Sequence, residues 1–406
     1  MVPINEPLLN GREKEYLDKC IETGWISSEG PFVAEFERQL SEKVDRKFGI
    51  AVSNGSVALE TAIAALGIGP GDSVIIPAFT IISCAAAIVR SGAIPVLCDA
   101  DPSTWNIDLN QLEDVIKKEI RRTDVTLKGI MVVHIYGLPV DMKIVNELAE
   151  KYGLVIIEDS AEMIGQTSRG RPCGSFGKIS TFSFYANKII TTGEGGMVVT
   201  DDFAIAEKCK KIKNLYFDAD RRFIHEELGW NFRMTNLQAA VGLAQLERLE
   251  QSVALKKNIG RCYTELLKGC NGLQLPIGKT DYAENICWAF GLVLNDEIPF
   301  DASETILRLK HLEIGARHFF WPMHLQPCLK KRGLFQNARF PVSERLAQRG
   351  FYLPSGMALK EEQMCDTVNA VKKVLLGEIP KSTQTFTMFY IPEKTLEKEL
   401  DFSKVL

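Results

Sequence analysis

The stretch Thr181-Phe-Ser-Phe-Tyr-Ala-Asn-Lys188-Ile-Ile-Thr-Thr-Gly-Glu-Gly-Gly196 is low in charge and ends in a glycine-rich turn that lets backbone approach a ligand closely. Upstream, the apolar run Leu154-Val-Ile-Ile157 is followed by Glu158-Asp159. A carboxylate at the C-terminal end of a buried strand can reach a pyridinium nitrogen, and a lysine amine can hold an aldehyde as a Schiff base. The pairing of Asp159 with Lys188 therefore indicates pyridoxal phosphate (PLP).

Composition places the chain among soluble globular proteins. Its 406 residues can bury a large core, and a formal net charge of -4 gives no electrostatic case for binding nucleic acid or an anionic membrane. The apolar stretch 81–89 is far shorter than the roughly 20 residues a membrane span needs. The N-terminus resembles neither a signal peptide nor a transit peptide, so we expect a cytoplasmic protein without a membrane partner.

Cysteine and histidine usage argues against metal chemistry. The 10 cysteines include no Cys-x-x-Cys pair, and the 5 histidines form no His-Glu-x-x-His arrangement. We expect free thiols and no metal ligands.

Short apolar strands alternate with helical patterns through the first half of the chain. Strands are predicted over residues 73–76, 94–98, 129–134, 154–158, 180–183 and 196–200, and helices over 13–23, 33–44, 54–66 and 83–91. This alternation predicts an α/β fold with a mostly parallel sheet covered on both faces, and with ligands at the C-terminal strand ends. Asp159 and Lys188 should then lie on one rim.

The second half of the chain predicts a smaller C-terminal part. A long helical pattern over residues 235–267 leads into it, followed by a strand over 287–294 and helices over 302–311 and 361–376. We therefore expect a large domain over residues 1–245, a small α+β domain over 246–378 and a C-terminal extension over 379–406. The extension contains the strand-like segment 383–390, and its role is unknown.

Seven separated motifs, in family order, resemble the DegT-type sugar-nucleotide aminotransferases. They are Gly24-Trp-Ile-Ser-Ser28, Val52-Ser-Asn-Gly-Ser56, Gly67-Ile-Gly-Pro-Gly-Asp72, His134-Ile-Tyr-Gly137, Glu158-Asp-Ser-Ala-Glu162, the Lys188 stretch, and Gly229-Trp-Asn-Phe-Arg-Met-Thr-Asn-Leu-Gln-Ala-Ala240. The resemblance runs from about Pro7 to about Val371. It implies the PLP-dependent transferase fold of type I, the fold of aspartate aminotransferase.

The resemblance implies roles for residues around the cofactor phosphate. Gly55, Ser56 and the backbone of Val57 would bind it at the start of a helix, where unpaired N–H groups and the helix dipole favour an anion. A simple helix cap by Asn54 or Ser56 is the alternative. Ser183 matches the family serine that binds the phosphate, although it could be an ordinary strand serine.

The cofactor ring has its own predicted neighbours. Asp159 would pair with the protonated ring nitrogen, and Lys188 would carry the cofactor. Glu162 matches a family position that approaches the ring or its 3-hydroxyl, the alternative being a solvated loop carboxylate. Where the family often stacks an aromatic residue on the ring this chain has Ile81, whose aliphatic side chain can still cover a ring face. Phe79 is the alternative, although we expect it to point elsewhere.

Asn231 matches a family residue that reaches the phosphate in the neighbouring subunit. The resemblance therefore implies a homodimer with shared active sites. Arg233 would act beside Asn231, or would hold the loop or the interface through a carboxylate.

Two stretches resemble the branch that makes 4-amino-4,6-dideoxy sugars, the perosamine synthases in particular. They are Thr191-Thr-Gly-Glu-Gly-Gly-Met197 and Ala316-Arg-His-Phe-Phe-Trp-Pro-Met-His-Leu-Gln-Pro327. His318, Phe320 and His324 would then contact sugar or diphosphate, although an aromatic-rich turn more often serves packing.

The resemblance implies transfer of an amine from L-glutamate to a nucleotide-linked 4-keto-6-deoxy sugar, in O-antigen or lipopolysaccharide synthesis. A 3-aminotransferase of UDP- or dTDP-linked sugars is the alternative. A related PLP-dependent sugar dehydratase is disfavoured, because that branch has histidine where Lys188 stands, and a non-enzymatic role is disfavoured by Asp159, Ser183 and Lys188 together. The sequence leaves open the nucleotide, the stereochemistry and the carbon that is aminated.

Overall fold

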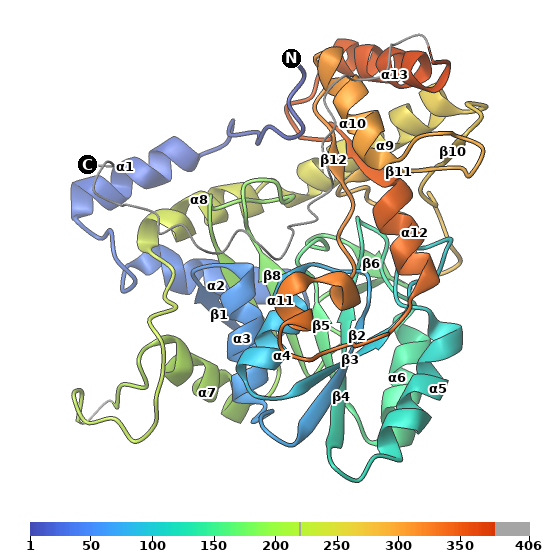
Figure 1. Cartoon of the computed structure of the whole chain (residues 1–406). Helices are drawn as coiled ribbons and strands as arrows, with labels where there is room; N and C mark the ends of the chain where they lie inside the picture. The colour runs from blue at the N-terminus through green and yellow to red at the C-terminus, as the bar shows by residue number, and fades with distance from the viewer. Residues whose placement is uncertain (219–220, 378–406) are drawn as a thin grey trace, which may run out of the picture.

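A seven-stranded sheet forms the centre of the large part of the protein (Figure 1). The computed structural model describes residues 1–218 and 221–377. The strand order is β1-β9-β8-β5-β4-β2-β3, and the bounds are β1 Phe48–Val52, β2 Asp72–Pro77, β3 Ile94–Cys98, β4 Thr126–Val133, β5 Val155–Asp159, β8 Ile179–Ser183 and β9 Gly196–Thr200. Only β9 runs against its neighbours, β8 and β1, among the pairings of this sheet. The predicted mostly parallel sheet is confirmed.

Helices cover both faces of this sheet. Along β4, Ile130 and Val132 face one hydrophobic core, and Met131 and Val133 face another, as the two-residue period of a strand requires. The first core is closed by α5 (Leu109–Ile120) and α6 (Met142–Tyr152). The second includes residues of α3 (Gly55–Ala65), α4 (Ile82–Arg90) and α7 (Phe203–Lys213). A sheet buried on both faces explains why its strands are nearly continuous apolar runs.

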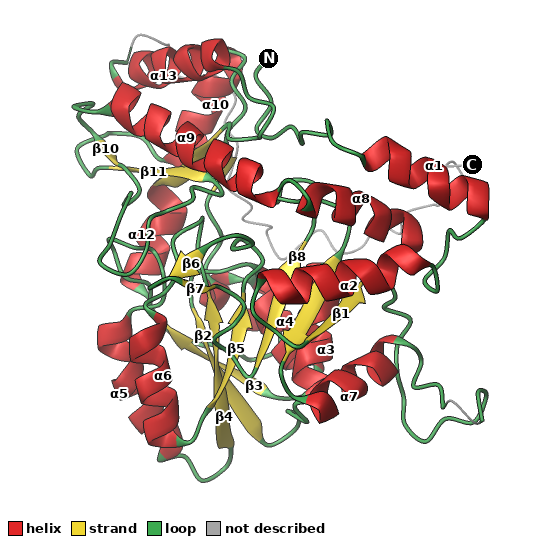
Figure 2. Ribbon diagram, turned by 180° about the vertical axis from the view of Figure 1, so that it is seen from behind, coloured by secondary structure: helices red, strands yellow, loops and turns green. Residues whose placement is uncertain are grey.

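A second, antiparallel sheet lies beyond the large one, with its own helices (Figure 2). Its order is β10-β11-β13-β12, with β10 Leu273–Gln274, β11 Phe290–Leu294, β12 Arg317–His318 and β13 Gly350–Leu353. Tyr263, Phe290 and Phe351 are fully buried in a separate core there, with residues of α10 (Ala302–His311) and α13 (Glu361–Leu375). This is the smaller α+β part that the sequence predicts, while its boundary at residues 245 and 246 stays a prediction.

The predicted helix over residues 235–267 is broken in two. A capping box between Thr235 and Gln238 starts α8 (Asn236–Leu246), and α9 (Leu249–Leu267) follows. Between them Arg248 leaves the helical conformation, with φ -113° and ψ 15°. The break lets α8 contact α1 (Glu13–Thr23) and α2 (Pro31–Lys43), while α9 packs on α13.

The remaining elements are short or peripheral. They are β6 Thr167–Ser168, β7 Arg171–Pro172, the 3-10 helix Met323–Leu325, α11 Pro327–Lys330 and α12 Pro341–Arg349. No helix in residues 1–218 and 221–377 has the length and apolar character to cross a membrane. The predicted extension, with its strand-like segment 383–390, lies outside the described residues.

Candidate active site

Asp159 lies at the C-terminal end of β5, on the floor of a large cavity. Its side chain is buried, and its carboxylate accepts hydrogen bonds from the Ala161 amide at 3.1 Å and the Cys84 thiol at 3.3 Å. Burial raises its pKa, although these hydrogen bonds and the charge of Lys188 oppose the shift. Within the described chain no cation forms an ion pair with this carboxylate, so a positively charged ring nitrogen would complete it.

Lys188 lines the same cavity from the loop after β8. Its ammonium lies 3.5 Å from Glu162 Oε1 and 4.0 Å from the centre of the Trp288 ring. An aromatic face attracts a cation, and so does a carboxylate. The two contacts place the reactive amine over the cavity rather than in solvent.

Trp288 is held in place through its backbone and its indole N–H. The N–H donates to the Asn187 carbonyl at 2.9 Å, and the Trp288 carbonyl accepts from the buried Lys256 ammonium at 2.6 Å. Lys256 also donates to the Ser355 carbonyl at 2.5 Å, and burial lowers its pKa to about 8. In the sequence Trp288 only marks the start of a predicted strand, whereas in the structure it is a neighbour of Lys188.

Glu162 is buried, so it is not the solvated loop carboxylate of the alternative interpretation. Its Oε2 accepts from the Tyr136 amide at 2.7 Å. Burial raises its pKa to about 7, although the charge of Lys188 pulls the other way. Tyr136 adopts φ 55°, a costly conformation for an aromatic residue, and its ring stacks on Trp288 and Phe320.

The start of α3 forms the anion-binding end of the cavity. Asn54 caps the helix by accepting from the Val57 amide at 3.0 Å, so that amide is already used. The Gly55 and Ser56 amides have no acceptor among the described residues and remain free for a phosphate. The Ser56 hydroxyl lies 2.7 Å from that of Ser83.

The residues around this helix start fit a PLP phosphate and ring. A Cβ added to Gly55 would lie 2.7 Å from the Ser183 Cβ, so only glycine allows this close approach. The hydroxyl of Thr181, which lines the cavity next to Asp159, is buried without a hydrogen-bond partner in the described chain. These groups suit a phosphorylated pyridine aldehyde. The start of α3 offers free amides for the phosphate, the Asp159 carboxylate is available for the ring nitrogen, and the Lys188 amine can react with the aldehyde.

Ile81 lines the cavity just before α4 and is 40% exposed, and its contact with a bound ring stays a prediction. Phe79 is fully buried and packs against Tyr136, Phe319 and Phe320, away from the cavity wall. Residues two apart on a strand would share a face, so this separation comes from the bend at residues 78–80 after β2 ends at Pro77.

Some side chains of the aromatic-rich turn after residue 316 line the cavity, and others are buried in the core. Phe320 lines the cavity, whereas His318 and His324 are absent from its wall. His324 is buried, with its Nε2 3.1 Å from Glu344 Oε1. A second wall residue from this turn is Arg317, which precedes His318 on β12 and was not predicted from the sequence. Substrate contacts by His318 and His324 stay predictions.

Asn231 is exposed, outside the cavity wall of its own chain. It forms a backbone bridge with Asn214, whose side chain accepts from the Arg233 guanidinium at 2.7 Å. Arg233 thus supports the loop that presents Asn231.

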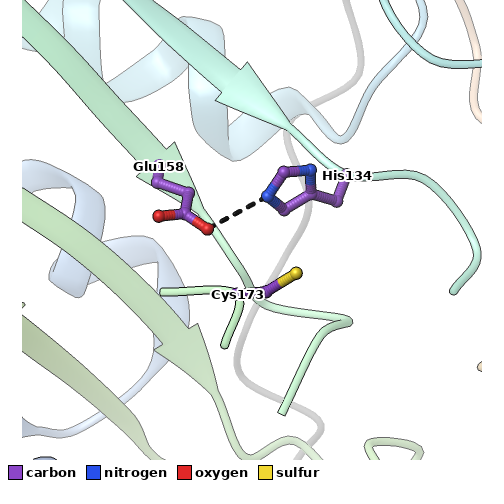
Figure 3. Close-up of side chains that lie close together, drawn as sticks. All are labelled: His134, Glu158 and Cys173. Atoms are coloured by element: carbon purple, nitrogen blue, oxygen red, sulfur yellow. Dashed lines mark hydrogen bonds and ion pairs between the residues drawn. The ribbon is translucent and has the colours of Figure 1, made fainter. Parts of the chain in front are cut away.

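His134, Glu158 and Cys173 lie close together behind the site, in a cluster with metal-ligand chemistry (Figure 3). The His134 Nδ1 accepts from the Val140 amide at 3.0 Å, so its Nε2 carries the proton and donates to Glu158 at 3.1 Å. Glu158 further accepts from the amides and hydroxyls of Gly174, Phe176, Gly177, Ser160 and Ser180. The polar atoms of His134 and Glu158 are thus occupied by hydrogen bonds, and Glu158 serves as an anchor for residues 174–177.

The cavity has a volume of about 970 Å³, large enough for a cofactor together with a substrate. It brings Gly55, Ser56, Val57, Ile81, Asp159, Glu162, Ser183, Lys188 and Phe320 together. A lysine amine beside a buried carboxylate pair can accept and return a proton at a carbon held above it.

Comparison with known proteins agrees with this site. The chain is 38% identical over 373 residues to a GDP-perosamine synthase of Vibrio cholerae, covering 92% of this chain and 98% of the relative. It is 35% identical over 332 residues to a UDP-N-acetyl-3-dehydro-alpha-D-glucosamine 3-aminotransferase of Acidithiobacillus ferrooxidans, covering 81% and 85%. A solved aminotransferase structure from Psychrobacter cryohalolentis superposes with a TM-score of 0.84 at 29% identity, covering 92% and 99%.

One protein family matches almost the whole of the described sequence. Residues 7–372 match the DegT/DnrJ/EryC1/StrS aminotransferase family. The chain belongs to this family, and it is a PLP-dependent aminotransferase.

Proposed function

We propose that the protein transfers an amine from L-glutamate to carbon 4 of a nucleotide-linked 4-keto-6-deoxy sugar, as a GDP-perosamine synthase would. The observation that carries the proposal is the single cavity that joins Lys188 and Asp159 to the free amides of α3. The 38% identity to the Vibrio cholerae relative supports the sugar and the nucleotide. A role in O-antigen or lipopolysaccharide synthesis follows from the same product.

The chain's own residues supply position and proton transfer. Bound PLP would supply an aldehyde for the amine and a ring that withdraws electrons. Asp159 would hold the protonated ring nitrogen from the cavity floor, and the amides of Gly55 and Ser56 would bind the phosphate. Lys188 would accept and return the proton at the substrate carbon as general base and acid, with its amine positioned by Glu162 and Trp288.

The rim of the cavity suits a nucleotide diphosphate. Arg90 and Arg332 both line the cavity. A guanidinium group can donate two parallel hydrogen bonds to two oxygens of one phosphate. Arg90 pairs with Glu60, and Arg332 donates to the Cys328 carbonyl at 2.9 Å, so each side chain is already oriented.

We further propose a homodimer in which Asn231 serves the partner's cofactor phosphate. Exposed apolar side chains near Asn231 support an interface: Phe223 is 81% exposed, Leu228 91% and Trp230 46%. The yellow-green segments over residues 215–218 and 221–230 project from the body in Figure 1. A second copy would cover these residues and place Asn231 against the other cavity.

We also infer a cytoplasmic location. All 10 cysteines are free, as expected in a reducing compartment.

A 3-aminotransferase of a UDP- or dTDP-linked sugar is the second candidate, supported by the 35% identity to the Acidithiobacillus ferrooxidans relative. A panel of GDP-, UDP- and dTDP-linked 3-keto and 4-keto sugars, assayed with L-glutamate, separates the two. Parallel lines in initial-rate plots are expected, because the two substrates share one site in turn. Lys188→Ala should abolish turnover, and near wild-type activity in that variant would contradict the assignment.

Subunit exchange tests the shared site. Lys188→Ala and Asn231→Ala protomers, each inactive or impaired alone, should regain activity when mixed. Both defects then fall in one cavity of the hybrid and leave the other cavity intact. Loss of one hydrogen bond to a charged phosphate is worth about 1.5–3 kcal/mol, so Asn231→Ala should also weaken PLP retention. Verified exchange without recovery would mean that Asn231 acts in its own chain or not at all.

A further inference from the structure

A second, smaller cavity of about 190 Å³ borders the large one. The two share wall residues, among them Asn187, Trp288, Arg317 and Tyr352. Trp288 lines both cavities and its ring centre lies 4.0 Å from the Lys188 ammonium, so a ligand group in the small cavity would lie near the reactive amine.

The N-terminal segment, residues 2–6, is tied down along this cavity. The Val2 amide donates to the Glu313 carbonyl at 2.8 Å, and the Ile4 carbonyl accepts from the Ser355 amide at 3.2 Å. The Asn5 side chain donates to the Ala186 carbonyl at 3.2 Å, next to the Lys188 stretch. Ile4 and Asn5 therefore form a fixed wall that joins the second sheet to the catalytic loop.

Arg317 presents its charge to both cavities. It pairs with Tyr352 across β12 and β13, so the two side chains share one face, and both line both cavities. Arg90 is compensated by Glu60, and Lys188 lies near Glu162. Within residues 1–218 and 221–377, no carboxylate forms an ion pair with Arg317, and its side chain is exposed to the cavity.

Asn187 supplies a second, independent indication of a ligand. Its side-chain oxygen is buried and has no hydrogen-bond partner in the described chain. A buried acceptor without a donor is costly, so a donor from a bound molecule would satisfy it.

We propose that the small cavity is the amino-donor subsite, in which Arg317 binds the carboxylate of an α-amino acid and Asn187 accepts from its amino group. This inference rests on the proposed function and names the residues that hold its donor. A planar guanidinium suits a carboxylate through two parallel hydrogen bonds. The volume suits an amino acid and is below the 300 Å³ or more of ordinary cofactor-sized pockets, so a nucleotide diphosphate belongs to the other rim.

Separate half-reactions of the holoenzyme test this assignment. Arg317→Gln should lower kcat/KM for L-glutamate by about 100-fold, since one charged bidentate contact is lost, and should lower kcat/KM for the keto sugar far less. Arg317→Lys keeps the charge without the fork, and an intermediate loss of about 10-fold is expected. Arg332 lines the large cavity but not the small one, so Arg332→Gln is the matched control and should impair only the sugar half-reaction.

Binding of glutarate, a dicarboxylate that cannot react, gives a readout independent of turnover. Calorimetry should show binding to wild type and about 100-fold weaker binding to Arg317→Gln. Equal glutarate binding, or a defect of Arg317→Gln confined to the keto sugar, would overturn the subsite. If wild type reacts with glutamate but aminates no sugar nucleotide, the proposed function fails while the subsite stands. Because Arg317 is exposed, unchanged thermal unfolding should accompany these results.

Discussion

Glu158 and Asp159 are consecutive carboxylates on β5, both buried, with opposite surroundings. Glu158 points to the side of the sheet where His134, backbone amides and hydroxyls surround it. Asp159 faces the cavity with two donors, one of them a thiol. Burial alone would raise the pKa of both groups, but the hydrogen bonds to Glu158, led by His134, lower its pKa to about 2.

The pKa of Asp159 is raised, in contrast, because its two donors do not offset burial. A buried carboxylate whose oxygens all accept hydrogen bonds stabilises the fold. A buried carboxylate with few donors is destabilising on its own, and a cationic ligand that pairs with it removes this cost. The difference separates an anchor from a functional group one residue away, which neither residue type nor burial could do.

Among the substitutions that test this difference, Asp159→Asn should have the largest effect, a loss of turnover. Without a charge to hold the ring nitrogen protonated, turnover should fall about 100- to 1,000-fold, the range for removal of one preorganised electrostatic contact. Stability of the cofactor-free protein should not fall, because the substitution removes a buried charge. Steady-state rates and urea unfolding measure the two quantities, and an unchanged turnover number would refute the assigned role.

Glu158→Gln should show the reverse pattern. The amide would face several N–H and O–H donors that it cannot accept equally, so the free energy of unfolding should fall by about 3–4 kcal/mol. Glu150→Gln, at an exposed position on α6, is the matched control and should change it by less than about 0.5 kcal/mol. If both variants unfold alike, Glu158 is not an anchor.

The same carboxylate predicts an acid limit to stability. The pKa of Glu158 lies at about 2 in the folded protein, below its ordinary value of 4.5. The unfolded state therefore binds the proton first, so this stabilisation is complete above about pH 4.5 and is lost as the pH falls toward 2. It amounts to about 3 kcal/mol by linkage. Urea unfolding at a series of pH values should show a shallower acid slope in Glu158→Gln than in wild type.

Sequence patterns were sufficient for the fold and for the chemistry of the cavity floor. The predicted bounds of α10 and β3 match the structure, and Asp159 and Lys188 meet in one cavity because parallel strand ends share an edge. The six donors to Glu158 could not be predicted, since several come from residues 174–177, whose placement depends on tertiary contacts with Arg46.

The small-domain side of the site was harder to predict for a different reason. Arg317 and His318 point to opposite faces of the two-residue strand β12. A shift of one residue in the pairing of β12 with β13 would therefore turn His318 toward the cavity and Arg317 away from it. Only the register with Tyr352 selects Arg317. Trp288 follows Cys287, whose φ of 50° turns the chain just before β11, and no local pattern announces that turn.

Cys173 should give the smallest effect, and it tests whether the anchor side is a metal site. The thiol is buried and its pKa lies well above the ordinary value, first because of burial and second because of the charge of Glu158. A thiol in that state is a poor ligand, and His134 already uses both ring nitrogens. Cys173→Ala should therefore cost only about 1 kcal/mol, from lost packing. Zinc or a chelator should leave the unfolding temperature of wild type unchanged, and a zinc-dependent rise that Cys173→Ala abolishes would instead make this cluster a metal centre.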